Sequence, residues 1–86
     1  LCGTGIGMAI AANKFKGVRA AVCHDAFSTT RAKLSNNTNV MTMGARVIGP
    51  ETAKMMVDIW LDNTYTGGRS VDKVNRIDEF EKENFV

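Results

Sequence analysis

The sequence predicts an α/β fold in which helices cover both faces of a parallel sheet. Two observations support this prediction. Short apolar runs alternate with longer segments of helical spacing, and a glycine-rich loop stands at the start of the first helical segment. Strands that alternate with helices form βαβ units, and a sheet built from such units is parallel and buried on both faces. The 86 residues suffice for one small domain or for part of one.

The first half of the chain predicts two helices separated by a buried strand. The expected segments are a helix over 6–14, a strand over 18–23 and a helix over 26–35. The first helix opens at the glycine loop. Asp25 or Ser28 is expected to cap the second helix, because each carries a side-chain oxygen that can accept a hydrogen bond from a free amide.

The second half predicts one strand and two amphipathic helices. A polar loop over 36–39 precedes a strand over 40–43. Pro50 is expected at the first position of a helix that ends at Asn63, because the amide that proline lacks has no partner at that position. A break at 66–68 then leads to the last helix. In the helix that begins at Pro50, apolar residues recur every three to four positions, at Ala53, Met56, Val57, Trp60 and Leu61.

Composition and charge exclude several functional classes. The contents of 44% hydrophobic and 23% charged residues exclude a disordered or collagen-like chain. No apolar run approaches the roughly 18–20 residues of a membrane span, and a net charge of +2 does not indicate nucleic-acid binding. Two cysteines cannot form the disulfide framework of a small secreted domain. We therefore expect a soluble protein of the reducing cytoplasm, with neither a membrane nor a nucleic acid as partner.

The chain begins at Leu1, directly before the glycine loop and without an initiator Met. Such a loop normally follows a buried strand, and Leu1 is all of that strand that the sequence shows. We expect residues 1–86 to be the C-terminal part of a single longer domain.

The segment from Cys2 to Gly7 carries the clearest chemical signal. Three glycines among residues 3–7 allow several backbone amides to point at one spot, and a helix that starts near Ile6 directs its positive end there. This arrangement suits a phosphate or a developing oxyanion, and a tight strand-to-helix turn is the alternative. The spacing matches neither the P-loop nor the dinucleotide fingerprint.

Cys2 lies directly before this loop. A thiol beside a helix N-terminus has a lowered pKa, because the helix dipole favours the thiolate. Cys2 could therefore act as a nucleophile or a general base, or it could be an inert thiol, which is how we interpret Cys23. His24 ends the next strand at the same edge of the sheet and could polarise a substrate oxygen or serve in a turn or cap. Two cysteines and one histidine lack metal-ligand spacing, so no metal site is expected.

Three cationic side chains are candidates for a phosphate site. Arg46 follows a strand end, and Arg69 and Lys73 lie about one turn apart where the last helix is expected to begin. Cations in a first helical turn oppose the helix dipole, which indicates a ligand rather than local stabilisation. Converging guanidinium and ammonium groups are suited to phosphate, and the alternative for each is a solvated surface charge.

Ordered motifs run through the chain from residue 1 to about residue 80. They are LCGTGIG at 1–7, IAANK at 10–14, GVRAA at 17–21, Asn36, Asn39-Val40, GARVIG at 44–49 and GGR at 67–69. Together these motifs resemble the ribose-5-phosphate isomerase B / galactose-6-phosphate isomerase family. The chains of that family are longer by roughly one N-terminal half, which carries an Asp-His pair near the first strand.

The resemblance implies a Rossmann-like three-layer α/β/α sandwich with a parallel sheet, whose N-terminal part lies outside this chain. It also implies a homodimer or higher homo-oligomer in which the active sites use both subunits. The implied activity is interconversion of aldose and ketose phosphates, of the ribose 5-phosphate/ribulose 5-phosphate type, through a cis-enediol. This reaction needs no cofactor, and none is expected.

The resemblance further implies roles for individual residues. Cys2 is the base that moves a proton between C1 and C2, Thr4 hydrogen-bonds the sugar, and Asn36 binds a substrate hydroxyl. The enediolate is held by the backbone amides of Gly3, Thr4, Gly5, Ile6 and Gly7. The phosphate and substrate contacts are Arg46, Arg69 and Lys73.

Two positions depart from the family pattern. Lys73 replaces the usual arginine, which keeps the charge and loses the bidentate fork. Ser35 stands where the ribose enzymes carry the histidine that helps open the sugar ring, and residues 34–37 and 42–49 also resemble the erythrulose-4-phosphate isomerases of the family. A tetrulose 4-phosphate cannot close a furanose ring through its esterified C4 oxygen. It therefore needs no ring-opening acid, and Ser35 is expected to hydrogen-bond the open chain.

Three alternatives stay open. Ribose 5-phosphate remains the substrate if His24 or a histidine of the N-terminal half opens the ring. A dinucleotide-binding module would use Asp25, about 20 residues past the loop, for the ribose hydroxyls. A fragment without enzymatic activity would contribute only a dimer surface, for which Phe80 and Phe85 on the last helix are suited.

Overall fold

A computed structural model describes residues 1–85 of the chain. It confirms the predicted order of helices and strands. The elements are α1 (Ile6–Ala12), β1 (Ala20–Val22), α2 (Ala26–Leu34), β2 (Val40–Thr42), α3 (Pro50–Asp62), a short 3-10 helix η1 (Gly68–Ser70) and α4 (Val71–Asn84). Among these described residues, no helix is long and apolar enough to cross a membrane.

The two strands are parallel, and the β2 segment has pairing partners on both sides. Ala20 pairs with Val40 on one side of β2. On the other side, Cys2 forms a parallel bridge with Gly44, just beyond the end of β2. The Cys2 amide donates to the Met43 carbonyl at 3.1 Å, so the residue that precedes the glycine loop is held against the end of β2.

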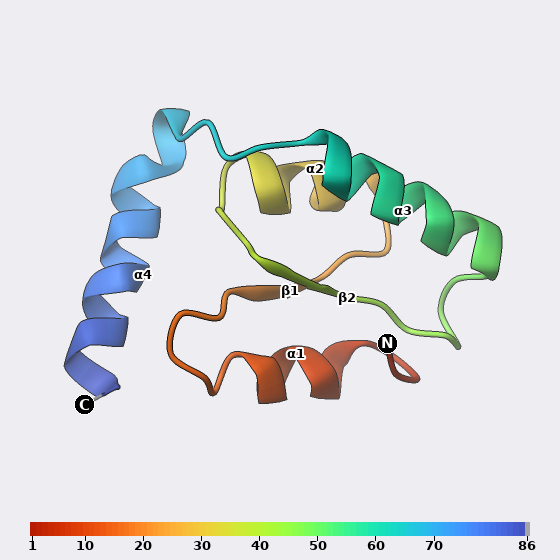
Figure 1. The fold of residues 1–86 in the computed structure, drawn as a ribbon, viewed down its shortest axis with the longest axis horizontal. Coiled ribbons are helices and arrows are strands. Elements are labelled where there is room, and N and C mark those ends of the chain that lie inside the picture. Colours follow the sequence, from red (N-terminus) through yellow and green to blue (C-terminus); the bar gives the residue numbers. More distant parts are fainter. Residues whose placement is uncertain (86) are drawn as a thin grey trace.

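Figure 1 shows three layers, with α1 on one face of the sheet and α2 and α3 on the other. The core between the sheet and these two helices contains Cys23, Ala32 and Trp60, which are at most 8% exposed. Ala21 and Met41 of the two strands pack against this cluster. This arrangement confirms the predicted α/β/α class with a parallel sheet.

Both strands are shorter than predicted, and β1 starts late because asparagine side chains replace strand pairing before Ala20. The Arg19 amide donates to Asn39 Oδ1 at 2.7 Å. On the outer edge of β1, the carboxamide of Asn13 accepts from the Ala20 amide at 2.7 Å and donates to the Ala20 carbonyl at 3.0 Å. Regular strand geometry therefore begins only at Ala20.

The predicted caps of the central helices are confirmed, whereas the apolar stripe of α3 is only partly buried. The Asp25 carboxylate accepts from the Ser28 amide at 2.7 Å at the start of α2, and Pro50 is the first residue of α3. Val57 and Leu61 are 37% and 69% exposed, since α3 packs on α2 along one narrow face that buries Met56 and Trp60.

The last helix, α4, lies at one end of the molecule, away from the other three helices (Figure 1). Val74 is its one buried residue. The carboxylate of Glu81 ties α4 to the rest of the chain by accepting a hydrogen bond from the Gly17 amide. Arg69 precedes α4 in η1, so only Lys73 lies in the first turn of α4, which corrects the expectation that both project from that turn.

Candidate active site

Cys2 and the loop that follows it form the first group of candidate residues. The Gly5 amide donates to Cys2 Sγ at 3.1 Å. Backbone amides, of which Met8 in the first turn of α1 contributes most and Gly5 next, lower the pKa of the Cys2 thiol. The half-buried position of Cys2 opposes this shift less strongly than the Met8 amide favours it. Cys2 is therefore poised to form a thiolate, the basic form of the side chain.

The amides of the loop divide into two sets. The Gly5 amide is bonded to Cys2 Sγ, and the Ile6 amide donates to Thr4 Oγ1 at 3.3 Å. The Thr4 amide also faces the Cys2 thiol and helps to lower its pKa. Within residues 1–85, the amides of Gly3 and Gly7 have no hydrogen-bond acceptor. The expectation that all five amides from Gly3 to Gly7 hold the enediolate is thereby narrowed, since three of them face side chains of the loop itself. The Thr4 hydroxyl accepts from Ile6 and keeps its own proton for a ligand.

A platform formed by residues 42–46 supports this loop. The buried Thr42 side chain donates from Oγ1 to the Gly5 carbonyl at 2.8 Å. Gly5 adopts a φ of +81°, and a Cβ at this position would lie 3.0 Å from the Met43 carbonyl carbon, so only glycine fits. A Cβ on Gly44 would lie 2.6 Å from Thr4 Cα. Sequence reasoning missed Thr42, whose only signal is a polar residue in an apolar strand.

Arg46 belongs to the same group. Its amide donates to the Gly3 carbonyl at 3.0 Å, and its side chain passes about 3.7 Å from the position that a Cβ of Gly3 would occupy. The exposed Arg46 side chain therefore leaves the backbone beside the glycine loop, where the phosphate hypothesis needs a cation.

His24 and Asp25 have local partners. His24 Nε2 accepts a hydrogen bond from the Gly44 amide at 2.8 Å, so this nitrogen carries no proton. The Asp25 carboxylate is occupied by capping α2, and the Ser28 amide that bonds it is the main cause of its lowered pKa. Of the roles left open for His24, the structure shows a backbone-holding one.

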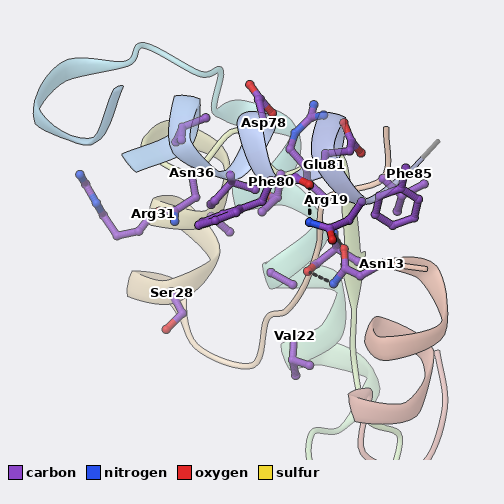
Figure 2. A pocket seen from close by; sticks show the side chains of 18 of the residues that line it. Asn13, Arg19, Val22, Ser28, Arg31, Asn36, Asp78, Phe80, Glu81 and Phe85 are labelled. Carbon is purple, nitrogen blue, oxygen red and sulfur yellow. Dashed lines mark hydrogen bonds between the residues drawn. The ribbon is translucent and has the colours of Figure 1, made fainter. Parts of the chain in front are cut away.

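A second group of candidate residues lies away from the Cys2 loop and consists of Asn36, Arg69 and Lys73. Asn36 follows the C-terminal end of α2 and lines a cavity of about 690 Å³ between α4, β1 and α2, where Figure 2 shows it near Arg31 and Phe80. Phe85 also lines this cavity, and Phe80 is 47% exposed. Among the described residues that line it, none belongs to the Cys2 loop.

Ser35 is buried, with 4% of its surface exposed. Its hydroxyl lies 2.9 Å from both the Arg31 carbonyl and Asn36 Oδ1, and it donates to one of them. Ser35 therefore faces Asn36 and the helix backbone. The expected hydrogen bond from Ser35 to the open sugar chain stays a prediction.

The two groups are separated along the long axis of a molecule that extends 39 Å. Figure 1 places α4, which carries Lys73 and follows Arg69 of η1, at one end, while the N-terminus with Cys2 lies toward the other. One chain thus does not bring Arg69, Lys73 and Asn36 together with Cys2.

Within residues 1–85, no group of three or more His, Cys, Asp or Glu side chains is placed to hold a metal ion.

Comparison of the sequence with known proteins identifies the family of this chain. The sequence model described as Ribose/Galactose Isomerase matches residues 1–77. The chain belongs to the ribose/galactose isomerase family. Membership was expected from the motifs at 1–7 and 44–49, and it is confirmed.

Relatives of the family carry two kinds of name. "Ribose-5-P isomerase B" of Listeria innocua is 54% identical over 98% of this chain and 57% of its own length. "D-erythrulose-4-phosphate isomerase" of Pectobacterium atrosepticum is 57% identical over 94% of this chain and 53% of its own length. The chain thus spans little more than half the length of these curated relatives.

Solved structures of the family share the fold. A ribose-5-phosphate isomerase B of Clostridium thermocellum superposes with a TM-score of 0.90 at 43% identity, covering 95% of this chain and 55% of that one. The type B enzyme of Trypanosoma cruzi also gives 0.90, at 37% identity, over 96% of this chain and 56% of that one. The Rossmann-like assignment is confirmed by these neighbours.

Proposed function

We propose that this chain is the C-terminal part of a cofactor-independent aldose–ketose isomerase that acts on a sugar phosphate. The observation that carries the proposal is the Cys2 thiol, whose pKa is lowered, beside a loop in which the backbone amides of Gly3 and Gly7 are free to donate. Proton abstraction next to a carbonyl needs a base of tuned pKa and fixed donors where negative charge develops. The family's named isomerases agree with this chemistry.

In the proposed mechanism Cys2 acts as the general base. The thiolate takes a proton from the carbon beside the carbonyl, the electron pair moves to form a cis-enediol, and the carbonyl oxygen gains negative charge. The amides of Gly3 and Gly7 donate to this oxygen. The hydroxyl proton of the neighbouring carbon then passes to this oxygen while the thiol returns its proton to the former carbonyl carbon, which leaves the other member of the aldose–ketose pair. Amide donors fixed before reaction lower the barrier because they need no reorganisation.

We propose that two subunits complete each site. Arg69, Lys73 and Asn36 lie far from Cys2 along the chain's long axis, so a partner molecule must supply them if they bind the same substrate. A two-fold dimer does this twice, since each subunit gives its Cys2 end to one site and its α4 end to the other. Arg46 is the cation that the Cys2 end itself provides.

The substrate favoured by position 35 is a tetrulose 4-phosphate rather than ribose 5-phosphate. A serine hydroxyl does not supply the proton that opens a furanose ring, and Ser35 is turned toward Asn36. His24 Nε2 does not replace the missing acid in this arrangement, because it accepts from the Gly44 amide. A four-carbon 4-phosphate has no furanose to open, which makes the acid unnecessary.

Measurement of kcat/KM for the full-length protein on ribose 5-phosphate and on erythrulose 4-phosphate tests this assignment. We expect a clear preference for erythrulose 4-phosphate, and Ser35→His should raise the relative rate on ribose 5-phosphate. A preference for ribose 5-phosphate in the wild-type protein would leave the isomerase proposal standing and reject the tetrulose substrate. If the protein converts neither of these sugar phosphates nor any other aldose phosphate, the isomerase proposal itself is rejected.

A dinucleotide-binding function is disfavoured by Asp25. Its carboxylate caps α2 and is thereby withdrawn from the role of binding ribose hydroxyls. A thermal-shift titration separates the two functions: a sugar phosphate should raise the Tm, and NAD or NADP should not.

A further inference from the structure

Gly44 is the residue against which the Cys2 loop is packed. It forms the parallel bridge with Cys2, and the next amide, that of Ala45, donates to the Cys2 carbonyl at 2.7 Å. The absence of a side chain lets the backbone of Thr4 lie directly on it. Any displacement of Gly44 is therefore passed to the loop that holds the thiol.

The strand register shows that a side chain, and not a strand carbonyl, accepts the hydrogen bond of the Gly44 amide. Val22 pairs with Thr42, and the Cys23 amide donates to the Thr42 carbonyl at 2.9 Å. In a regular parallel ladder the Gly44 amide would then donate to the carbonyl of Cys23. The imidazole of His24 accepts this hydrogen bond instead, at 2.8 Å, as the chain turns toward α2.

We infer that His24 is a positioning residue for the Cys2 loop, because its Nε2 holds the Gly44 amide on one side while Cys2 is paired on the other. Gly44 is buried, so without the imidazole its amide loses its only partner among the described residues. The amide must then shift toward another acceptor, and the loop shifts with it. The catalytic consequence of this inference rests on the proposed isomerase function, whereas its effect on the thiol does not.

The first test measures the reactivity of the Cys2 thiol in the full-length protein. Peptide-resolved alkylation with iodoacetamide across a pH series gives the pKa and the rate of Cys2, with the fully buried Cys23 as an unreactive internal reference. In His24→Ala we expect a higher pKa for Cys2, because the amides that favour the thiolate no longer surround it. A rise of one unit would lower the alkylation rate at neutral pH by up to about tenfold.

Two variants separate positioning from general destabilisation. His24→Gln keeps an acceptor at a similar reach and should restore most of the Cys2 reactivity. Asn13→Ala removes the side chain that bonds Ala20 at the other end of β1, so it should lower the Tm without changing Cys2. Wild-type reactivity in His24→Ala, failure of His24→Gln to restore it, or an equal loss in Asn13→Ala would each overturn the inference.

Turnover supplies the second readout. If His24 maintains the geometry of the loop, His24→Ala should lower kcat by about tenfold or more. KM should change little, since the residues that the partner subunit is proposed to supply for phosphate binding stay in place. A parallel rise in KM with unchanged kcat would contradict positioning of the base. If the wild-type protein turns over no sugar phosphate, the isomerase proposal fails while the alkylation result still decides the role of His24.

Nitrogen-15 NMR of the wild-type imidazole tests the inference without any substitution, should His24→Ala not fold. We expect the proton on Nδ1 and an unprotonated Nε2 near neutral pH, with the Gly44 amide protected from solvent exchange. A proton on Nε2, or a rapidly exchanging Gly44 amide, would overturn the inference.

Discussion

At the scale of single residues, the proposed site combines a thiol of lowered pKa with backbone donors. Cys2 contributes the sulfur, and the geometry around it depends on residues that carry no reactive group, Gly5, Thr42 and Gly44. We expect these supporting residues to matter for the proposed reaction, because a misplacement of about 1 Å can cost on the order of 10²-fold in rate.

Replacement of the base is the most direct prediction at this scale. Cys2→Ala should lower kcat by about 10²–10⁴-fold, the typical contribution of a general base, while substrate binding is largely retained. Steady-state kinetics together with a thermal-shift titration of the sugar phosphate measure the two quantities. Cys23→Ala serves as the control, since Cys23 is buried in the core and should affect the Tm rather than kcat. Near-normal kcat in Cys2→Ala would remove the assignment.

A second residue-level prediction concerns the close approach at Gly44. Gly44→Ala should destabilise the protein by about 1–3 kcal/mol, a typical cost of overpacking, and should lower kcat because the backbone of Thr4 must move. Gly49→Ala is the matched control, since a Cβ there meets nothing within 4 Å. Denaturant titration and kinetics of both variants check this. Equal, small effects at the two glycines would show that the loop tolerates displacement.

At the scale of elements, the N-terminus of α2 offers a prediction about pH. The Ser28 amide, with help from the Ser28 hydroxyl, lowers the pKa of Asp25. A carboxylate with a lowered folded-state pKa stabilises the fold above its unfolded pKa, and this contribution is lost as the pH falls below about 4. Asp25→Ala should therefore lower the Tm at pH 7, and the difference from wild type should shrink toward pH 3.

Asp25→Asn provides the comparison for this prediction, because it keeps a capping oxygen without the charge. It should lose less stability than Asp25→Ala, and its Tm difference from Asp25→Ala should vary little with pH. Thermal unfolding of the three proteins between pH 3 and pH 7 measures this. A Tm difference between wild type and Asp25→Ala that is constant with pH would mean that the carboxylate contributes only as a neutral acceptor.

The elements themselves were largely predictable from local patterns. The start of α3 followed from Pro50, the cap of α2 from Asp25, and both strands from apolar runs between turns. The start of β1 was not, because Asn13 and Asn39 bond the backbone of Ala20 and Arg19 in place of a neighbouring strand. These contacts join residues 7 and 20 positions apart in the sequence, which the alternation of apolar and polar residues does not indicate.

The site was predictable in its chemistry and less so in its arrangement. The glycine loop pointed to Cys2 and the backbone amides as candidates, and the structure places Arg46 beside them. The division of labour among the amides depends on which ones Cys2 Sγ and the Thr4 hydroxyl engage. Likewise, the burial of Ser35 and the acceptor role of His24 follow from tertiary packing, which composition and spacing do not encode.

At the scale of the whole molecule, the separation of the two residue groups makes a sharp prediction. Cys2→Ala and Arg69→Ala should each be inactive, and a mixture refolded together should regain about one quarter of wild-type activity if sites are shared in a two-fold dimer. Half of the dimers are then mixed, and in each of these one of the two sites is intact. Kinetics on the reassociated mixture measure this, with separately refolded and then pooled proteins as the control. No recovery would reject shared sites.

The 86 residues expressed alone are expected to fold poorly and to show no isomerase activity. Leu1, Ile6 and Ile10 are more than half exposed, and Leu1–Cys2 presents an open edge beside β2. A chain with so small a core gains little from burial. Circular dichroism during heating and an activity assay test this, and a cooperative transition accompanied by turnover would contradict it.

The pairing of Asn13 with Ala20 has a consequence for how molecules avoid one another. An outer strand offers unpaired backbone groups that can recruit a strand from a neighbouring chain, the first step toward aggregation. The carboxamide of Asn13 supplies one donor and one acceptor, which is what a foreign strand would bring, and it already occupies both groups of Ala20. The C-cap residue of α1 therefore blocks the open edge of β1 at Ala20. A chain with Asn13→Ala should form intermolecular β-structure more readily than the wild type under mild heating.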